Sequence, residues 1–63
     1  MNFIELIQRQ AAQVFGNQDK ADVWLNQRKS VFGGVTPIEF AHTEIGYNAV
    51  KDVLERIDKG YPS

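Results

Sequence analysis

His42 and Thr43 are the adjacent side chains of this sequence whose types suit acid–base chemistry. An imidazole can take a proton from a hydroxyl group, so the pair is a candidate base and nucleophile. Neighbours at a helix end do not generally face each other, and no third group in the sequence is placed to orient the ring. We therefore expect His42 to be a helix-end residue near the last carbonyls, and we predict no catalytic residue.

Gly33-Gly34 stands ahead of an expected helix start and superficially resembles a loop that cradles phosphate. A nucleotide-binding loop would also need a Lys-Ser or Lys-Thr pair, or a third spaced glycine after a strand, and both are missing. The chain contains no cysteine and one histidine, which is too few ligands for a metal site. We predict no metal and no cofactor, and we expect that the protein is not an enzyme.

Length and composition indicate one small globular domain spanning residues 1–63. The hydrophobic fraction is 43%, and four Phe, two Tyr and one Trp exclude a disordered chain. At roughly 1.5 kcal/mol of ordering entropy per residue, folding costs nearly as much as so small a core returns. No disulfide can supply the difference, so tight helix packing or self-association must, and we expect a homodimer.

Charge and hydropathy limit the expected classes of partner and the expected cellular location. No apolar run approaches the roughly twenty residues of a membrane span, and the start, Met-Asn-Phe-Ile-Glu, lacks the basic leader of a signal peptide. A cytoplasmic protein is the expectation. The net charge is −1, and seven basic residues are interleaved with eight acidic ones. Nucleic-acid binding by this chain alone is therefore disfavoured, because gripping phosphates requires a basic face.

The apolar spacing predicts an all-α fold, a compact bundle of about four short helices. Residues 3–15 carry an apolar stripe with helical spacing, and Gly16-Asn17 ends that helix and caps the next. A second helix is expected from about Gln18 to Lys29, with Arg28 and Lys29 near its negative end. Ala21, Trp24 and Leu25 form its buried face. We expect Trp24 to be the centre of the core, as packing and not as a ligand platform.

Thr36-Pro37-Ile38-Glu39 predicts a helix start. Thr at the N-cap, Pro at the first helical position and Glu two residues later form a capping box. The helix that begins there is expected to be short, because Thr43 has the features of a second cap.

The last helix is predicted from about Glu44 to Lys59, with Gly60 just past its end and Pro62 preventing continuation. Val50, Val53, Leu54 and Ile57 give it an apolar face. Two acid-before-base pairs four residues apart, Asp52 with Arg56 and Glu55 with Lys59, are expected on its solvent side. Gly46 in its first turn costs about 1 kcal/mol relative to Ala, so we interpret it as a site of close helix approach.

The tail Gly60-Tyr61-Pro62-Ser63 allows two interpretations. An aromatic residue, a stiffening proline and a free carboxylate, with Arg56 and Lys59 one turn back, could probe a cleft in another protein. Alternatively, the tail is frayed, or Tyr61 folds back over Ile57 as a hydrophobic cap. The residues alone favour neither.

The ordered set of residues resembles the toxin-binding domain of Xre/MbcA/ParS-like antitoxins, over roughly residues 11–60. The elements that carry this resemblance are Val14-Phe15-Gly16, Lys20-Ala21, Trp24-Leu25, Gly34, Thr36-Pro37-Ile38, Thr43, Gly46, Val50, Val53-Leu54, Arg56-Ile57 and Gly60. The resemblance implies a helical, dimerising module of a bacterial type II antitoxin. Its usual partner is a RES-domain toxin that attacks NAD, and the antitoxin's C-terminal end obstructs the entry of NAD into the toxin's active site.

Carried over to this chain, the resemblance places partner binding at the end of the last helix and the tail. Arg56 and Gly60 match the family pattern directly. Four further residues are assigned by proximity to them: Lys59, Tyr61, Pro62 and Ser63.

Two features depart from the family pattern. Family members commonly carry an N-terminal helix-turn-helix region that binds operator DNA, and 63 residues leave no room for one. Arg28-Lys29 stands where the family often has Pro-Asn, so the second helix is expected to run longer here.

The sequence therefore predicts a protein-binding module that neutralises a toxin. One alternative is a small DNA-binding or transcription-associated helical protein, because helices two and three joined by a glycine turn could imitate a helix-turn-helix. The segment after Pro37 offers only Glu39, His42 and Glu44 as charged or titratable groups, which does not suit a recognition helix. A purely structural dimerisation module is the other alternative.

Overall fold

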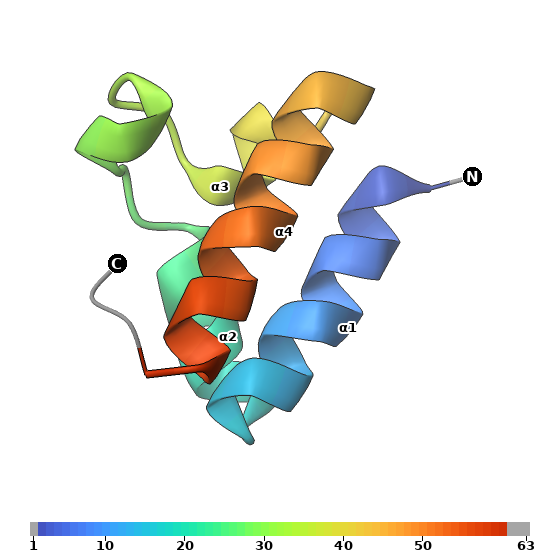
Figure 1. Cartoon of the computed structure of the whole chain (residues 1–63), viewed down its shortest axis with the longest axis vertical. Helices are drawn as coiled ribbons and strands as arrows, with labels where there is room; N and C mark the ends of the chain where they lie inside the picture. The colour runs from blue at the N-terminus through green and yellow to red at the C-terminus, as the bar shows by residue number, and fades with distance from the viewer. Residues whose placement is uncertain (1, 61–63) are drawn as a thin grey trace.

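The computed structural model describes residues 2–60, which form four α-helices and one 3-10 helix (Figure 1). The elements are α1 (Phe3–Phe15), α2 (Gln18–Leu25), the 3-10 helix η1 (Ser30–Phe32), α3 (Pro37–Phe40) and α4 (Glu44–Asp58). The predicted all-α bundle of about four short helices is confirmed. Within the described part of the chain, no helix is both long enough and apolar enough to cross a bilayer.

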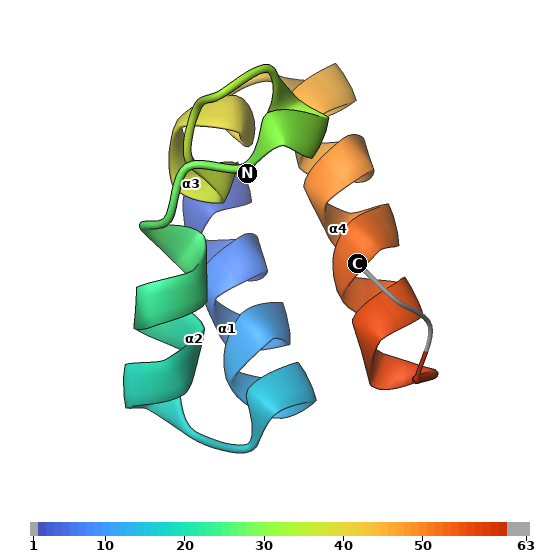
Figure 2. The same ribbon diagram turned by 90° about the vertical axis from the view of Figure 1, so that its left-hand side faces the viewer.

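α1 is the central helix of the bundle and packs against both α2 and α4. Figure 2 shows α2 and α4 on either side of it, with α3 at the end of the molecule where α1 and α4 begin. The opposite end gathers the turn between α1 and α2 and the last turn of α4. Segments far apart in the sequence are thereby brought to one end of the fold.

Among residues 2–60, the core is formed by nine buried hydrophobic residues drawn from α1, α2, η1, α4 and the C-cap of α3. They are Ile7, Ala11, Ala21, Trp24, Leu25, Phe32, Ala41, Val50 and Leu54. Phe32 of η1 also stacks on Phe40 of α3, with ring centroids 4.9 Å apart.

Trp24 is not the centre of this core, contrary to the prediction. It keeps 9% of its surface exposed, whereas Ile7, Leu25 and Leu54 have none. One side of its ring meets Phe15, with centroids 5.9 Å apart, and the ammonium of Lys29 lies 5.3 Å from the ring centroid. Leu25, and not the larger indole, is the fully buried large side chain of α2.

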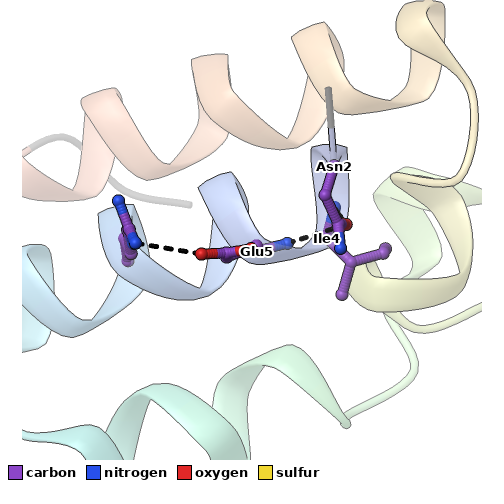
Figure 3. A network of polar contacts seen from close by, with 4 residues as sticks. Asn2, Ile4 and Glu5 are labelled. Atoms are coloured by element: carbon purple, nitrogen blue, oxygen red, sulfur yellow. Dashed lines mark hydrogen bonds and ion pairs between the residues drawn. The ribbon is translucent and has the colours of Figure 1, made fainter.

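α1 starts at a cap that the apolar pattern does not reveal. The Oδ1 atom of Asn2 accepts hydrogen bonds from the backbone N–H groups of Ile4 and Glu5, at 3.1 and 3.2 Å (Figure 3). Glu5 also pairs with Arg9 at 2.9 Å, as expected from their spacing of four residues. The helix ends at Gly16, whose φ of +66° is left-handed, and Asn17 then caps α2 by accepting from Lys20 N. These boundaries confirm the predicted ones.

α2 ends at Leu25, four residues before the predicted end at Lys29. The side-chain amide of Asn26 donates to the carbonyl of Asp22 at 2.8 Å, beside the backbone bond from Asn26 N to the same carbonyl at 3.1 Å. The chain then turns back, and Lys29 and Val35 form an antiparallel bridge with a 3.1 Å bond from Lys29 N to Val35 O. Arg28 and Lys29 therefore lie in a loop and do not lengthen α2.

The two predicted threonine caps are confirmed, one with a changed bonding pattern. Thr43 Oγ1 accepts from Gly46 N at 3.0 Å, and Thr36 Oγ1 accepts from Glu39 N at 3.1 Å. In a full capping box, the glutamate carboxylate also accepts a hydrogen bond from the backbone N–H of the cap residue. Here the Glu39 carboxylate instead accepts from the Thr36 hydroxyl itself, at 3.1 Å.

Gly46 is buried where α4 passes the end of α3, so the predicted close approach is confirmed. A Cβ atom built at this position would overlap the carbonyl oxygen of Phe40 and lie 2.8 Å from its carbonyl carbon. Backbone atoms cannot give way as a side-chain tip can. The absence of a side chain at Gly46 is thus required by the packing of α3 on α4.

The last turn of α4 differs slightly from the expectation. The helix ends at Asp58 with Lys59 as its C-cap, one residue before the predicted end. Asp52 and Arg56 form the expected ion pair at 3.0 Å. The expected pair of Glu55 with Lys59 does not form within 4.0 Å.

Candidate partner-binding surface

The end of α4 presents two exposed cations. Arg56 lies in its last turn with 60% of its side chain exposed, and Lys59 is the exposed cap residue. Gly60 follows with a φ of +85°, a left-handed conformation that ends the helix and that a side chain would strain. Tyr61, Pro62 and Ser63, the other predicted site residues, lie outside the described residues.

The fold holds this end of α4 in place. Leu54 is fully buried, and Ile57 packs against the core from the last turn. Backbone bonds from Lys59 N to Glu55 O (3.1 Å) and from Gly60 N to Ile57 O (3.0 Å) fix the cap. An exposed ion pair such as Arg56 with Asp52 contributes only about 0–1 kcal/mol. Arg56 can therefore exchange this carboxylate for one on a partner at small cost.

The residues first considered for chemistry are placed apart from this end. His42 is exposed in the turn between α3 and α4. The Thr43 hydroxyl oxygen accepts from Gly46 N at the cap of α4. Among residues 2–60, no three His, Cys, Asp or Glu side chains are grouped so that they could hold a metal ion.

An open hollow along α2 is a feature that the sequence did not reveal. Its volume is about 430 Å³ and its surface is almost entirely apolar; it is lined by Phe15, Asp19, Lys20, Val23, Trp24 and Gln27. Val23 leaves 58% of its surface exposed there. The one signal in the sequence is that Val23 falls outside the stripe of Ala21, Trp24 and Leu25. A single exposed valine is common on protein surfaces and would not by itself have located a cavity.

Comparison with known proteins places this arrangement in a family. Residues 10–60 match the family described as the Antitoxin Xre/MbcA/ParS C-terminal toxin-binding domain. The chain belongs to this family. Its fold is therefore that of an antitoxin domain that binds a toxin, and the resemblance drawn from the residues is confirmed.

A relative from Pseudomonas putida, Antitoxin Xre, is 39% identical to this member of the family over 51 residues. The aligned segment covers 81% of the present chain and 32% of that relative. The chain thus spans about a third of the length of the curated antitoxin that it matches. No solved structure matches it significantly.

The family match covers most of the fold but begins inside α1. The match starts at Gln10, within α1, and includes α2, α3 and α4 to Gly60. Ile7 precedes the match and is nevertheless fully buried in the core. The first two turns of α1 are therefore part of this folding unit.

Proposed function

We propose that this chain neutralises a RES-domain toxin by placing its C-terminal end against the site where the toxin binds NAD. The match of residues 10–60 to a toxin-binding domain carries the proposal. The type of toxin and the blocked site come from the resemblance in the sequence. The residues that would make the contact are Arg56, Lys59, Gly60, Tyr61, Pro62 and Ser63.

The structure of α4 supports this mode of action. A helix anchored by Leu54 and Ile57 ends in an exposed turn, so it can enter a cleft without unfolding. Preorganisation of this kind lowers the entropic cost of binding. Blocking an active site requires occupied volume and no chemistry from the antitoxin. A chain whose polar side chains serve as helix caps and surface pairs is suited to that role.

Co-expression with the toxin encoded by the adjacent gene tests the proposal. Cells that make the toxin and the intact chain should grow and keep their NAD. Removal of residues 60–63 should restore toxicity while the two proteins still purify together. Ile45→Ala, at the exposed opposite end of α4, is the control and should leave neutralisation intact. Full neutralisation by the shortened chain would refute the blocking mechanism, and a toxin that never binds the intact chain would refute the function.

Dimerisation and a cytoplasmic location are part of the same proposal. Nine buried hydrophobic residues form the core of the described part, residues 2–60, and association with a second copy would add buried apolar surface. A toxin that attacks NAD acts where the cell keeps that nucleotide, and its antitoxin must meet it there. Sedimentation equilibrium of the purified chain should give twice the monomer mass at micromolar concentration. A monomer at all concentrations would refute the dimer.

A further inference from the structure

Side chains in this fold make almost all of their hydrogen bonds to near neighbours in the sequence. Among residues 2–60, these local bonds join residues two to four positions apart, at helix caps, along one helix face or in the loop after α2. One bond is different, because it joins two helices. The side-chain Nε2 of Gln10 in α1 donates to the backbone carbonyl of Lys51 in α4 at 3.3 Å, across 41 positions of the chain.

The Lys51 carbonyl can accept this bond without any change in α4. Within an α-helix, each carbonyl accepts from the N–H group four residues later, and a carbonyl oxygen has two lone pairs. The second lone pair is available to a donor from outside the helix. Gln10 and Lys51 are both half-buried, so water competes less for this bond than for one on the open surface. The bond therefore ties α1 to α4 while both helices stay intact.

The start of α4 is fixed by two close contacts. Gly46 lies against the carbonyl of Phe40, with no room for a side chain. One residue later, Tyr47 stacks on Phe3 of α1, with ring centroids 5.0 Å apart and 25° between the ring planes. These contacts define where α4 begins, and they lie at the opposite end of the helix from Arg56.

The second half of α4 is held by apolar side chains. Leu54 is fully buried, and Ile57 packs against the core. Burial of apolar surface is favourable but has no direction, whereas a hydrogen bond weakens steeply when its distance or angle changes. The bond from Gln10 to the Lys51 carbonyl is thus the last directional side-chain contact that holds α4 within the described chain before Arg56 is reached.

We propose that Gln10 is a positioning residue for toxin binding: its bond to the Lys51 carbonyl sets the register of α4 on α1, and with it the place where Arg56 and the helix end meet the toxin. This inference rests on the function proposed above. Arg56 follows Lys51 by about 7.5 Å along the helix axis, so a shift at the bond is passed on to the end of the helix. A site that is about 1 Å out of place is enough to impair function.

Binding measurements on a matched pair of variants test this role. The purified full chain is titrated into a catalytically inactive form of the toxin encoded by the adjacent gene. Gln10→Met keeps the length of the side chain and removes the donor. Because one hydrogen bond shifts an equilibrium by up to about tenfold, fewer molecules would hold α4 in the binding register, and Kd should rise about tenfold. Gln13→Met makes the same replacement at an exposed position of α1 and should change Kd by less than about twofold.

The temperature of the titration separates positioning from stability. Melting curves by circular dichroism give the unfolding midpoint of each variant, and Kd is measured well below the lowest midpoint, where every variant is folded. A lower stability alone would leave Kd unchanged there. A rise in Kd for folded Gln10→Met therefore reports the register of α4.

Nuclear magnetic resonance of the free chain reports the bond and its consequence. In Gln10→Met, the carbonyl carbon resonance of Lys51 should move, because its hydrogen bond is lost. The amide resonances of Arg56 and Gly60 should move as well, because the end of α4 is displaced. In Gln13→Met, all three resonances should stay in place.

The outcomes separate this inference from the proposed function. If the intact chain binds the toxin and folded Gln10→Met binds equally well, the positioning role is wrong and the proposed function stands. If Gln10→Met binds weakly but the resonances of Arg56 and Gly60 do not move, Gln10 touches the toxin itself, which overturns the inference. If the intact chain does not bind the toxin, the proposed function fails and this inference fails with it.

Discussion

The junction at Gly46 and the hollow along α2 are opposite kinds of packing within one small fold. At Gly46, even one added carbon would overlap the backbone of Phe40. Beside Val23 and Trp24, about 430 Å³ stays open to solvent. The first region leaves no room because it fixes how α3 lies on α4. The second is open to solvent, and the fold does not completely bury its side chains.

This contrast separates residues that determine stability from residues available for recognition. Changes at the closed junction should unfold the chain and affect binding only as a consequence. Changes at Val23, on the open side of the hollow, should leave stability intact.

Gly46→Val should have the largest effect. The branched side chain would collide with the Phe40 carbonyl, and the expected loss is about 4 kcal/mol or more, comparable to the whole stability of so small a fold. Thermal unfolding followed by circular dichroism should lose its cooperative transition. Asn48→Val introduces the same valine side chain at an exposed position of α4 and should keep the cooperative transition. A stable Gly46→Val protein would show that the close packing of α4 on the end of α3 is not required for the fold.

Leu54→Ala should destabilise the chain by about 3 kcal/mol, because it leaves a cavity at a fully buried site. Urea unfolding would measure this as a lower midpoint with an unchanged slope. Ile45→Ala removes a comparable side chain from an exposed position of α4 and serves as the reference. Equal midpoints for the two variants would contradict the assignment of Leu54 to the core.

Thr36→Ala should cost about 1 kcal/mol, since it removes the acceptor that caps α3 at the Glu39 N–H. Thr36→Ser keeps the hydroxyl group and should recover most of the loss. The same urea experiment gives both values. If serine and alanine behaved alike, the hydrogen bond would not be what stabilises this end of α3.

Val23→Asp should change the free energy of unfolding by no more than about 0.5 kcal/mol, because Val23 is largely exposed and no buried group depends on it. A large loss of stability from this substitution would mean that the hollow belongs to the core, and the contrast with Gly46 would disappear.

Sequence reasoning succeeded where the signal is local to one turn. The structure confirms two helix starts, at Thr36 and Thr43, and one helix end, at Gly16. Each of these residues acts on backbone groups within a few residues, so its effect can be predicted from the local sequence. Gly46 was also understood correctly, since a glycine in a first helical turn has a cost that close packing must offset.

The errors occurred where contacts outside the apolar pattern decide the outcome. After α2 the chain turns into the bridge between Lys29 and Val35, which the helical periodicity of the apolar residues does not contain. The place of Trp24 depends on how α2 is rotated against α1 and α4. The hollow requires Phe15 from one helix and Val23 from another, so no spacing within a single element predicts it. The C-terminal site came from the family resemblance and stays a prediction.

The most direct test of toxin neutralisation is the rate of NAD consumption by the purified RES-domain toxin from the adjacent gene, titrated with this chain. The account predicts that the rate falls to the background level once the chain reaches the concentration of toxin sites. The chain without residues 60–63 should bind and leave the toxin active. An unchanged rate of NAD consumption in the presence of saturating intact chain would contradict the account.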